Sequence, residues 1–370
     1  MPGFDSIIDQ ERPIRTLASF LTHGTIPHAL LFTGIEGVGK RTAAIAFAMA
    51  CNCMGGPREN GTAAAGRPPA TARACGECPA CRKIAAGRHP DVLRVVPDGA
   101  QVKIEQVRDL CQSLALKPYE ARVRVAVIAE AHRLTTAAGN ALLKMLEEPP
   151  DRTVLILTAP QTADLLPTVV SRCRHLRFKP IARKHLAAML VRAYGFTADE
   201  AALTAAMANG SVTRALAMQR SHWVRRRNWF LSELAALPRQ PVASLLALAE
   251  RVALAKEDIP DYLELASSWV RDLAVARHDP EQILHQDLRP EITAAAQSVR
   301  QGFVPLASTG LAETQRRIQA NANPRLSLEA LFIRLAAKPI STNASAACTI
   351  SRDAWICGSS ATWPGARTCT

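Results

Sequence analysis

The chain lacks any apolar run long enough to cross a membrane. Its first residues, MPGFDSIIDQERPIR, also lack the basic segment and apolar core of a secretion signal, so we expect a cytoplasmic protein. The 370 residues suffice for two or three domains, and 48% apolar with 21% charged residues is typical of a globular protein. The net charge of +13 suggests an anionic partner such as nucleic acid, although a basic surface without a partner explains it equally well.

A disulfide framework is not expected among the ten cysteines, because no export signal is present. Cys75, Cys78 and Cys81 form a C-x-x-C-x-x-C pattern, which directs three thiolates toward one point. An iron–sulfur cluster of the ferredoxin kind needs another cysteine soon afterwards, followed by proline, but the sequence there reads RKIAAG. A tetrahedral Zn²⁺ needs one more ligand, which Cys51 or Cys53 can supply. We predict structural zinc, with inert thiols as the alternative.

A magnesium ligand is missing from GIEGVGKRT (34–42), which otherwise has the spacing of a phosphate loop. In such a loop backbone N–H groups and a lysine hold phosphate, and a Ser or Thr hydroxyl holds Mg²⁺. The phosphate-holding residues are present: Gly34, Gly37, Gly39 and Lys40. Arg41 stands where the hydroxyl is needed, and Thr42 comes one position late. Nucleotide binding therefore stays open, whereas chemistry assisted by a metal is not expected.

A second metal contact is missing from RVRVAVIAEAHRLT (122–135), which reads as an apolar strand followed by an acidic turn. The metal-binding aspartate expected before Glu130 is Ala129. Glu130 alone could polarise a water, but without Mg²⁺ little stabilises the transition state of phosphoryl transfer. We therefore do not expect this chain to hydrolyse ATP by itself.

Five apolar runs alternate with helical patterns, which predicts a doubly wound parallel sheet ending near Pro180. The predicted strands lie in HALLFTG (28–34), DVLRVV (91–96), RVRVAVIA (122–129), TVLILT (153–158) and RHLRF (174–178). The predicted helices run from 40 to about 53, then over 103–116, 135–148 and 163–170. A nucleotide would sit at the carboxyl end of the first strand.

After Pro180 the sequence predicts only helices. One begins with Thr197 as N-cap and Glu200 completing a capping box, and Asn209-Gly210 ends it. The last helical pattern starts at Pro324 and carries an apolar stripe, which is either the core of its own domain or a packing face for another subunit: Leu328, Leu331, Phe332 and Leu335. Residues 339–370 show no period, and we expect either a disordered tail or the product of a shifted reading frame.

Several motifs resemble the bacterial clamp-loader subunits of the AAA+ superfamily over about residues 8–338. They are HALLFTGIEGVGKRT, the cysteine cluster, GRHPDV (87–92), NALLKMLEEPP (140–150) and the SRC of 171–173. In this family the gamma/tau motor subunits carry intact metal-binding motifs and the delta prime subunits often carry degenerate ones. Arg41 and Ala129 match the delta prime type. In GSVTRAL (210–216), Thr213 stands where the motor subunits have a sensing arginine, and Arg214 follows one step later.

The resemblance implies an AAA+ P-loop domain at 1–179 with a zinc-binding insertion at about 53–81. A helical lid domain at 180–237 and an all-α collar domain at 238–338 would follow. It implies a hetero-pentamer with gamma/tau and delta subunits that loads a sliding clamp onto primed DNA, as an accessory part of a DNA polymerase. Asn52-Cys53 matches the family's zinc module, which favours Cys53 over Cys51, although the insertion before Cys75 exceeds the usual spacing.

The SRC motif supplies an arginine to a neighbour's nucleotide in this family, so the resemblance makes Arg172 an arginine finger rather than an ordinary surface arginine. Two other functions compete with this non-motor role. The chain could be a motor, or a related AAA+ ATPase acting on DNA, with Thr42 and Glu130 as substitutes, or a zinc-dependent DNA-binding module. Hydrolysis by the isolated chain would favour the motor, and tight DNA binding without partners would favour the module.

Overall fold

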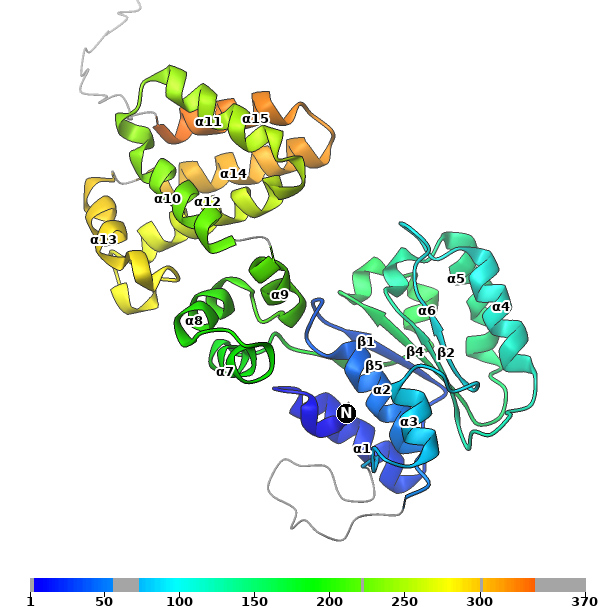
Figure 1. The fold of residues 1–370 in the computed structure, drawn as a ribbon. Helices are drawn as coiled ribbons and strands as arrows, with labels where there is room; N and C mark the ends of the chain where they lie inside the picture. The colour runs from blue at the N-terminus through cyan, green and yellow to red at the C-terminus, as the bar shows by residue number, and fades with distance from the viewer. Residues whose placement is uncertain (1–2, 56–72, 221–222, 300–301, 337–370) are drawn as a thin grey trace, which may run out of the picture.

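The computed structural model describes residues 3–55, 73–220, 223–299 and 302–336. The predicted tail at 339–370 and most of the insertion between Cys53 and Cys75 lie outside the described residues. Figure 1 shows an α/β part, which contains the N-terminus, and a helical remainder that extends away from it. None of the helices in these described ranges is long and apolar enough to span a membrane.

The α/β part is built on five parallel strands in the order β2-β3-β4-β1-β5. Their bounds are β1 Ala29–Thr33, β2 Val92–Val95, β3 Arg124–Ile128, β4 Thr153–Ala159 and β5 Arg174–Arg177. Every residue of β1, β3 and β4 is buried, as expected of parallel strands covered on both faces. The predicted fold class, a five-stranded parallel α/β sheet followed by helical segments, is confirmed.

Two hydrophobic cores cover the two faces of the sheet, and successive residues of β1 alternate between them. Leu30 and Phe32 pack with α1 (Glu11–His23), α2 (Lys40–Asn52) and α3 (Pro79–Ala85). Leu31 packs on the other face with α4 (Ile104–Ala115), α5 (Thr136–Glu147) and α6 (Pro167–Val170). The two helix groups lie on opposite sides of the strands in Figure 1.

The single helix predicted over 163–170 is wrong in its extent. The structure has a 3-10 turn at Thr162–Asp164, called η4, and then the short helix α6 from Pro167 to Val170. Leu165 and Leu166 between them are extended or non-helical. Proline disfavours the helical conformation in the residue before it but is well suited to a first helical turn, so Pro167 starts a new helix.

Three helices follow the sheet: α7 (Arg183–Tyr194), α8 (Ala198–Met207) and α9 (Val212–Arg220). The predicted capping box at α8 is confirmed, because the Thr197 hydroxyl accepts a hydrogen bond from the Glu200 N–H at 3.3 Å and the Glu200 carboxylate accepts one from the Thr197 N–H at 3.2 Å. Asn209 and Gly210 then take positive φ values of 50° and 79°, and the chain turns into α9.

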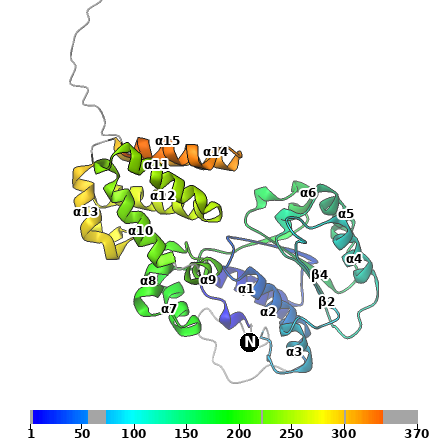
Figure 2. The same ribbon diagram turned by 45° about the horizontal axis from the view of Figure 1, so that its top comes forward.

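The C-terminal helices are α10 (Trp223–Ala236), α11 (Val242–Leu254), α12 (Ile259–Val275), α13 (Arg289–Ser298), α14 (Phe303–Gln319) and α15 (Pro324–Ala336). The Phe230 ring of α10 lies 4.8 Å from Tyr262 of α12 and 6.3 Å from Phe332 of α15. Figures 1 and 2 show α10 with these helices rather than with α7 and α8. The sequence groups α10 with the lid domain, so we propose that the second helical unit begins near Trp223.

The apolar stripe predicted on the last helix is buried within this chain. Leu328, Leu331 and Phe332 are at most 2% exposed and Leu335 is 6% exposed. All four belong to one core that includes residues of α10, α11 and α12. They therefore pack inside the chain rather than forming an exposed face for another subunit. Short 3-10 turns complete the described chain at Phe4–Ser6, Ala131–Arg133, Leu237–Arg239, Lys256–Asp258, Pro280–Gln282 and Gln286–Leu288.

Candidate functional site

The phosphate loop connects β1 to α2 and depends on glycine at its tightest contact. Gly34, Gly37 and Gly39 have φ values of +143°, +78° and +96°, a region that disfavours other residues. A Cβ atom at Gly37 would lie 2.5 Å from the Ser211 Oγ, so the loop packs directly against the segment that begins α9. The Val212 N–H also donates a hydrogen bond to the Gly37 carbonyl at 3.1 Å. This contact fixes the loop against the helical part of the chain.

The loop borders a cavity of about 520 Å³, the size of a small-molecule site. Four of the residues predicted to bind nucleotide line it, and Gly34 stands at the start of the loop: Gly37, Gly39, Lys40 and Thr42. Mostly apolar residues from three other segments, the N-terminal segment, α7 and α9, also line it: Ile7, Ile8, Met189, Tyr194 and Leu216. The cavity therefore combines a phosphate-type end with an apolar region, as a nucleotide site requires.

Lys40 points into its own loop. Its Nζ donates hydrogen bonds to the carbonyls of Gly34 and, at 2.8 Å, Ile35. Burial lowers the pKa of Lys40 to about 8, although the nearby carboxylates of Glu36 and Glu130 raise it. A cation held in this way can exchange its carbonyl partners for phosphate oxygens, so the loop keeps the means to bind an anion.

The two positions at which the sequence analysis expects metal ligands hold residues that cannot supply them. Arg41 and Ala129 both line the cavity, and neither side chain can ligate a cation. Two acidic residues line the cavity, Glu36 and Glu130, and Glu130 is held by an ion pair of 3.0 Å with Arg133. The cavity thus presents cationic groups and two carboxylates, one of them paired with Arg133, but Arg41 and Ala129 offer no ligand for the Mg²⁺ that a hydrolytic site needs.

Thr158 is a cavity residue that the sequence analysis did not single out. It lies near the carboxyl end of β4, and its hydroxyl accepts a hydrogen bond from the Glu130 N–H at 3.1 Å. The available signal was a polar residue closing an apolar strand at the ligand-binding edge of the sheet. Thr213 also lines the cavity, whereas Arg214 forms an ion pair with Glu264 of α12.

Arg172 lies outside this cavity, just after α6. Its Nη1 donates a hydrogen bond to the Thr168 carbonyl at 3.0 Å, and its Nη2 lies 2.6 Å from a carboxylate oxygen of Glu147. The side chain is 36% exposed. The guanidinium is therefore oriented by its own chain while it remains accessible from outside. That arrangement is compatible with a role at a neighbouring subunit.

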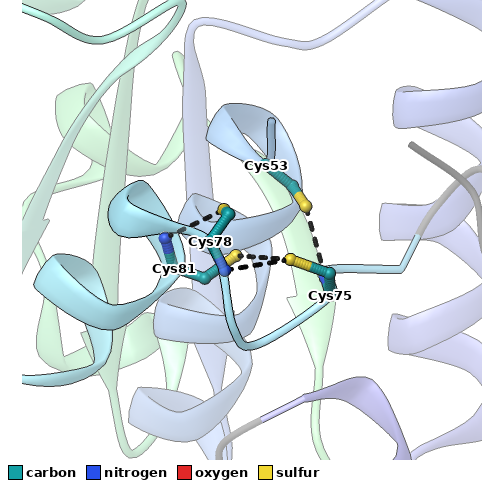
Figure 3. A group of neighbouring side chains, drawn as sticks. All are labelled: Cys53, Cys75, Cys78 and Cys81. Carbon is teal, nitrogen blue, oxygen red and sulfur yellow. Dashed lines mark hydrogen bonds between the residues drawn. The ribbon is translucent and has the colours of Figure 1, made fainter. Parts of the chain in front are cut away.

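The four cysteines predicted to bind metal come together (Figure 3). The Sγ atoms of Cys53, Cys75, Cys78 and Cys81 all lie within 4.8 Å of one another, and those of Cys75 and Cys81 are 4.0 Å apart. Zn–S bonds of about 2.3 Å in a tetrahedron place sulfur atoms about 3.8 Å apart, so this donor set fits a structural zinc. Cys51 lies outside the group.

Backbone amides support thiolates at this cluster. The Cys75, Cys78 and Cys81 N–H groups donate hydrogen bonds of 3.2 to 3.4 Å to the sulfurs of Cys53, Cys75 and Cys78 respectively. Burial raises the pKa of Cys78, but the Cys81 amide and other hydrogen bonds lower it to about 6. Burial raises the pKa of Cys51 to about 12, which keeps it a neutral thiol. Burial is also outweighed at Cys75, where backbone amides lower the pKa, whereas burial raises the pKa of Cys53 and Cys81, so the hydrogen bonds favour a thiolate at two of the four cysteines.

Asn52, which precedes Cys53, anchors the start of β3. Its Oδ1 accepts hydrogen bonds from the N–H groups of Arg122 and Val123 at 2.9 and 3.0 Å. Its Nδ2 donates to the Val123 carbonyl at 2.8 Å. Asn52 is 3% exposed, so these bonds satisfy an amide group that would be costly to bury alone. The Asn-Cys pair therefore links the cysteine cluster to the sheet.

Asp91, in the GRHPDV motif, anchors the loop that precedes β3. Its carboxylate accepts hydrogen bonds from the N–H groups of Tyr119, Glu120 and Ala121 at 2.8 to 3.0 Å. The Arg124 Nε lies 3.3 Å from the same carboxylate. Burial raises the pKa of Asp91, but the three amides and Arg124 outweigh it, so the pKa lies below its usual range. The motif was recognised in the sequence, but this role was not.

A parallel α/β domain with a phosphate loop, followed by helical segments, defines a phosphate-loop protein whose metal positions are altered. A family model described as DNA polymerase III, delta subunit, matches residues 9–182. The DNA polymerase III subunit delta' of Bacillus subtilis (strain 168) is 27% identical over 331 residues, which cover 88% of this chain and 96% of that protein.

The DNA polymerase III subunit tau of Escherichia coli (strain K12) is 35% identical over 178 residues, 48% of this chain and 26% of that protein. The chain therefore spans about a quarter of that tau subunit. Among solved structures, a DNA polymerase III gamma subunit-related protein from Thermotoga maritima has a TM-score of 0.41 at 15% identity, covering 89% of this chain and 99% of that chain. The resemblance to delta prime, and to the related gamma and tau subunits, is confirmed.

Proposed function

We propose that this chain is a non-motor, delta prime-type subunit of a DNA polymerase III clamp loader. The observation that carries the proposal is the cavity itself. It keeps the phosphate loop and Lys40 but has Arg41 and Ala129 at both metal positions. The similarity to a delta' subunit over nearly the full length of that protein supports the same role.

In this role the chain assembles with gamma/tau and delta subunits into a cytoplasmic hetero-pentamer and helps to load the sliding clamp onto primed DNA. The C-terminal helices form the collar through which the subunits assemble, and α7 to α9 form the lid. The expected result of co-expressing this chain with gamma/tau and delta subunits is a complex that copurifies. Failure of the chain to enter such a complex would refute the proposal.

Arg172 acts in this assembly as an arginine finger at the nucleotide of a neighbouring motor subunit. Its contacts with Thr168 and Glu147 orient the guanidinium before any neighbour arrives. Preorganised positive charge stabilises charge that develops on a transferring phosphoryl group. The chain then contributes to hydrolysis at another subunit's site while performing none at its own.

The second candidate is a motor subunit, and Thr42 favours it because this residue lines the cavity near the loop. The purified chain should nevertheless show no ATPase activity above background, with or without DNA, because both metal contacts are lost. Turnover would be measured beside a gamma/tau subunit as the positive control. Turnover comparable to that control, abolished by Lys40→Ala, would establish the motor.

The cysteine cluster holds one structural Zn²⁺ through Cys53, Cys75, Cys78 and Cys81. Freshly purified, reduced protein should contain about one zinc per chain, and Cys78→Ser should lower both metal content and stability, because formation of such a site is coupled to folding. Cys51→Ser is the matched control and should keep its zinc. Metal analysis that finds no zinc in the reduced wild-type protein would overturn the assignment.

A further inference from the structure

The loop between α4 and β3 is held firmly but exposes large side chains. Tyr119 is 85% exposed and Leu116 is 69% exposed. The backbone of this loop is held by hydrogen bonds, because the Asp91 carboxylate accepts from the amides of 119–121 and the Asn52 Oδ1 accepts from the amides of 122–123. Buried Arg124 adds hydrogen bonds to the carbonyls of Leu114 and Leu116. Three buried polar side chains thus fix a loop whose own side chains contact solvent.

Such a loop is well suited to binding. Ordering a flexible loop on association opposes binding, and a loop already fixed in the free protein avoids that cost. An aromatic ring presented on a rigid backbone offers a large face with little conformational freedom to lose. The hydrogen bonds therefore account for the backbone of this loop, whereas Tyr119 contributes little to the core at 85% exposure.

Exposed cationic residues lie close to Tyr119 in sequence and on the helix that its loop contacts. Lys117 and Arg122 are exposed on the same loop, and Lys83 of α3 pairs with Glu120 at 2.7 Å, which joins the loop to the cysteine module. Arg82 directly precedes Lys83, Arg88 follows it by five positions just after α3, and both are exposed. We call Leu116, Lys117, Tyr119 and Arg122, together with Arg82, Lys83 and Arg88, the Tyr119 surface. It carries five cationic residues, of which Lys83 is paired with Glu120 and the other four have no such pairing within this surface.

We propose that the Tyr119 surface binds single-stranded nucleic acid. A base stacks on the Tyr119 ring, and Lys117 and Arg122 contact the phosphates on either side. Aromatic stacking combined with a cationic track is how proteins bind single strands without sequence preference. Paired bases do not expose their faces, so a duplex cannot use the ring in this way. None of its residues lines the nucleotide cavity, and the proposal does not depend on the clamp-loading role. The binding proposed is salt-dependent and without sequence preference, and it differs from the tight binding that would favour a DNA-binding module.

The test is binding of the full chain to a fluorescent oligo-dT strand at low salt, followed by anisotropy. Tyr119→Ala should weaken binding by roughly fivefold or more, because stacking is worth about 1–3 kcal/mol per base. Tyr119→Phe should bind like wild type, because the ring and not the hydroxyl stacks. The matched control is Leu254→Ala, which truncates a side chain that is 80% exposed on α11.

Charge is tested separately. The double variant Lys117→Ala with Arg122→Ala should make the plot of log affinity against log salt shallower by about 1.4, which corresponds to two lost phosphate contacts on a single strand. Lys256→Ala, at an exposed lysine between α11 and α12, should leave the slope unchanged. Absence of oligo-dT binding by wild type, or equal binding by Tyr119→Ala, overturns the proposal. The proposal is also overturned if the chain captures an acidic protein through this surface, if the Tyr119→Phe variant captures it equally, and if oligo-dT does not displace it.

Discussion

Arg172→Ala is expected to slow the clamp- and DNA-stimulated ATPase of the assembled complex and its clamp loading. An arginine finger is typically worth about 10³–10⁵ in rate at the site that it serves. The defect of the whole complex should be smaller, because the other motor sites keep their own fingers. The chain should still fold and assemble, since a surface guanidinium contributes little to stability. Steady-state ATPase and clamp-loading assays on the purified complex measure the effect.

Two controls make the result specific. Arg108→Ala removes another exposed arginine, on α4, and should leave the ATPase of the complex unchanged. Lys40→Ala alters the chain's own phosphate loop and should do much less than Arg172→Ala, because in the proposed function that loop performs no chemistry. The reverse pattern, with Lys40→Ala crippling loading and Arg172→Ala silent, would show that this subunit is a motor.

The contacts of Arg172 also indicate how the finger would engage. The ion pair with Glu147 joins groups that are 36% and 50% exposed. Pairs exposed to this degree are worth only about 0–1 kcal/mol, so exchanging the carboxylate for a phosphate oxygen costs little. The hydrogen bond to the Thr168 carbonyl can remain during the exchange and keep the guanidinium in place. The intrachain contacts therefore orient the Arg172 guanidinium and would not prevent it from taking the proposed role.

The sheet and the cysteine cluster were predictable because their signals are local. Each strand is a short apolar run bounded by polar or turn residues, and burial on both faces makes such runs continuous. The C-x-x-C spacing brings Cys75, Cys78 and Cys81 together within a single turn and the start of α3, whatever the rest of the fold does. The capping box joins Thr197 and Glu200, which are only three positions apart, and it could be predicted for the same reason.

Features that depend on residues distant in the chain could not be predicted from the sequence. The place of α10 depends on contacts of Phe230 with Tyr262 and Phe332, and its own sequence does not reveal those partners. In the same way, Asn52 bonds residues about 70 positions away and Asp91 bonds residues about 30 positions away. The hydrogen-bond partners of a buried polar residue can be identified only once the fold has brought them together.

Asp91→Ala is expected to lower the free energy of unfolding more than any other substitution proposed above. It leaves the amides of Tyr119, Glu120 and Ala121 without their acceptor and removes the carboxylate from Arg124, which is 6% exposed. Breaking a buried pair by removing one partner typically costs about 3–5 kcal/mol, because the remaining charge is left uncompensated. Urea unfolding of the full chain measures the loss, and hydrogen exchange at residues 119–121 should accelerate.

Asp109→Ala, at an exposed position on α4, is the matched control and should change the free energy of unfolding by no more than about 0.5 kcal/mol.

The effect of pH provides an independent check. The pKa of Asp91 is lower in the folded protein than in the unfolded chain, where it is about 3.9. Its contribution is therefore complete above that pH and is lost as the pH falls through the folded pKa. The difference between wild type and Asp91→Ala should shrink below about pH 4, and a difference that stays constant there would show that the carboxylate charge does not hold this loop.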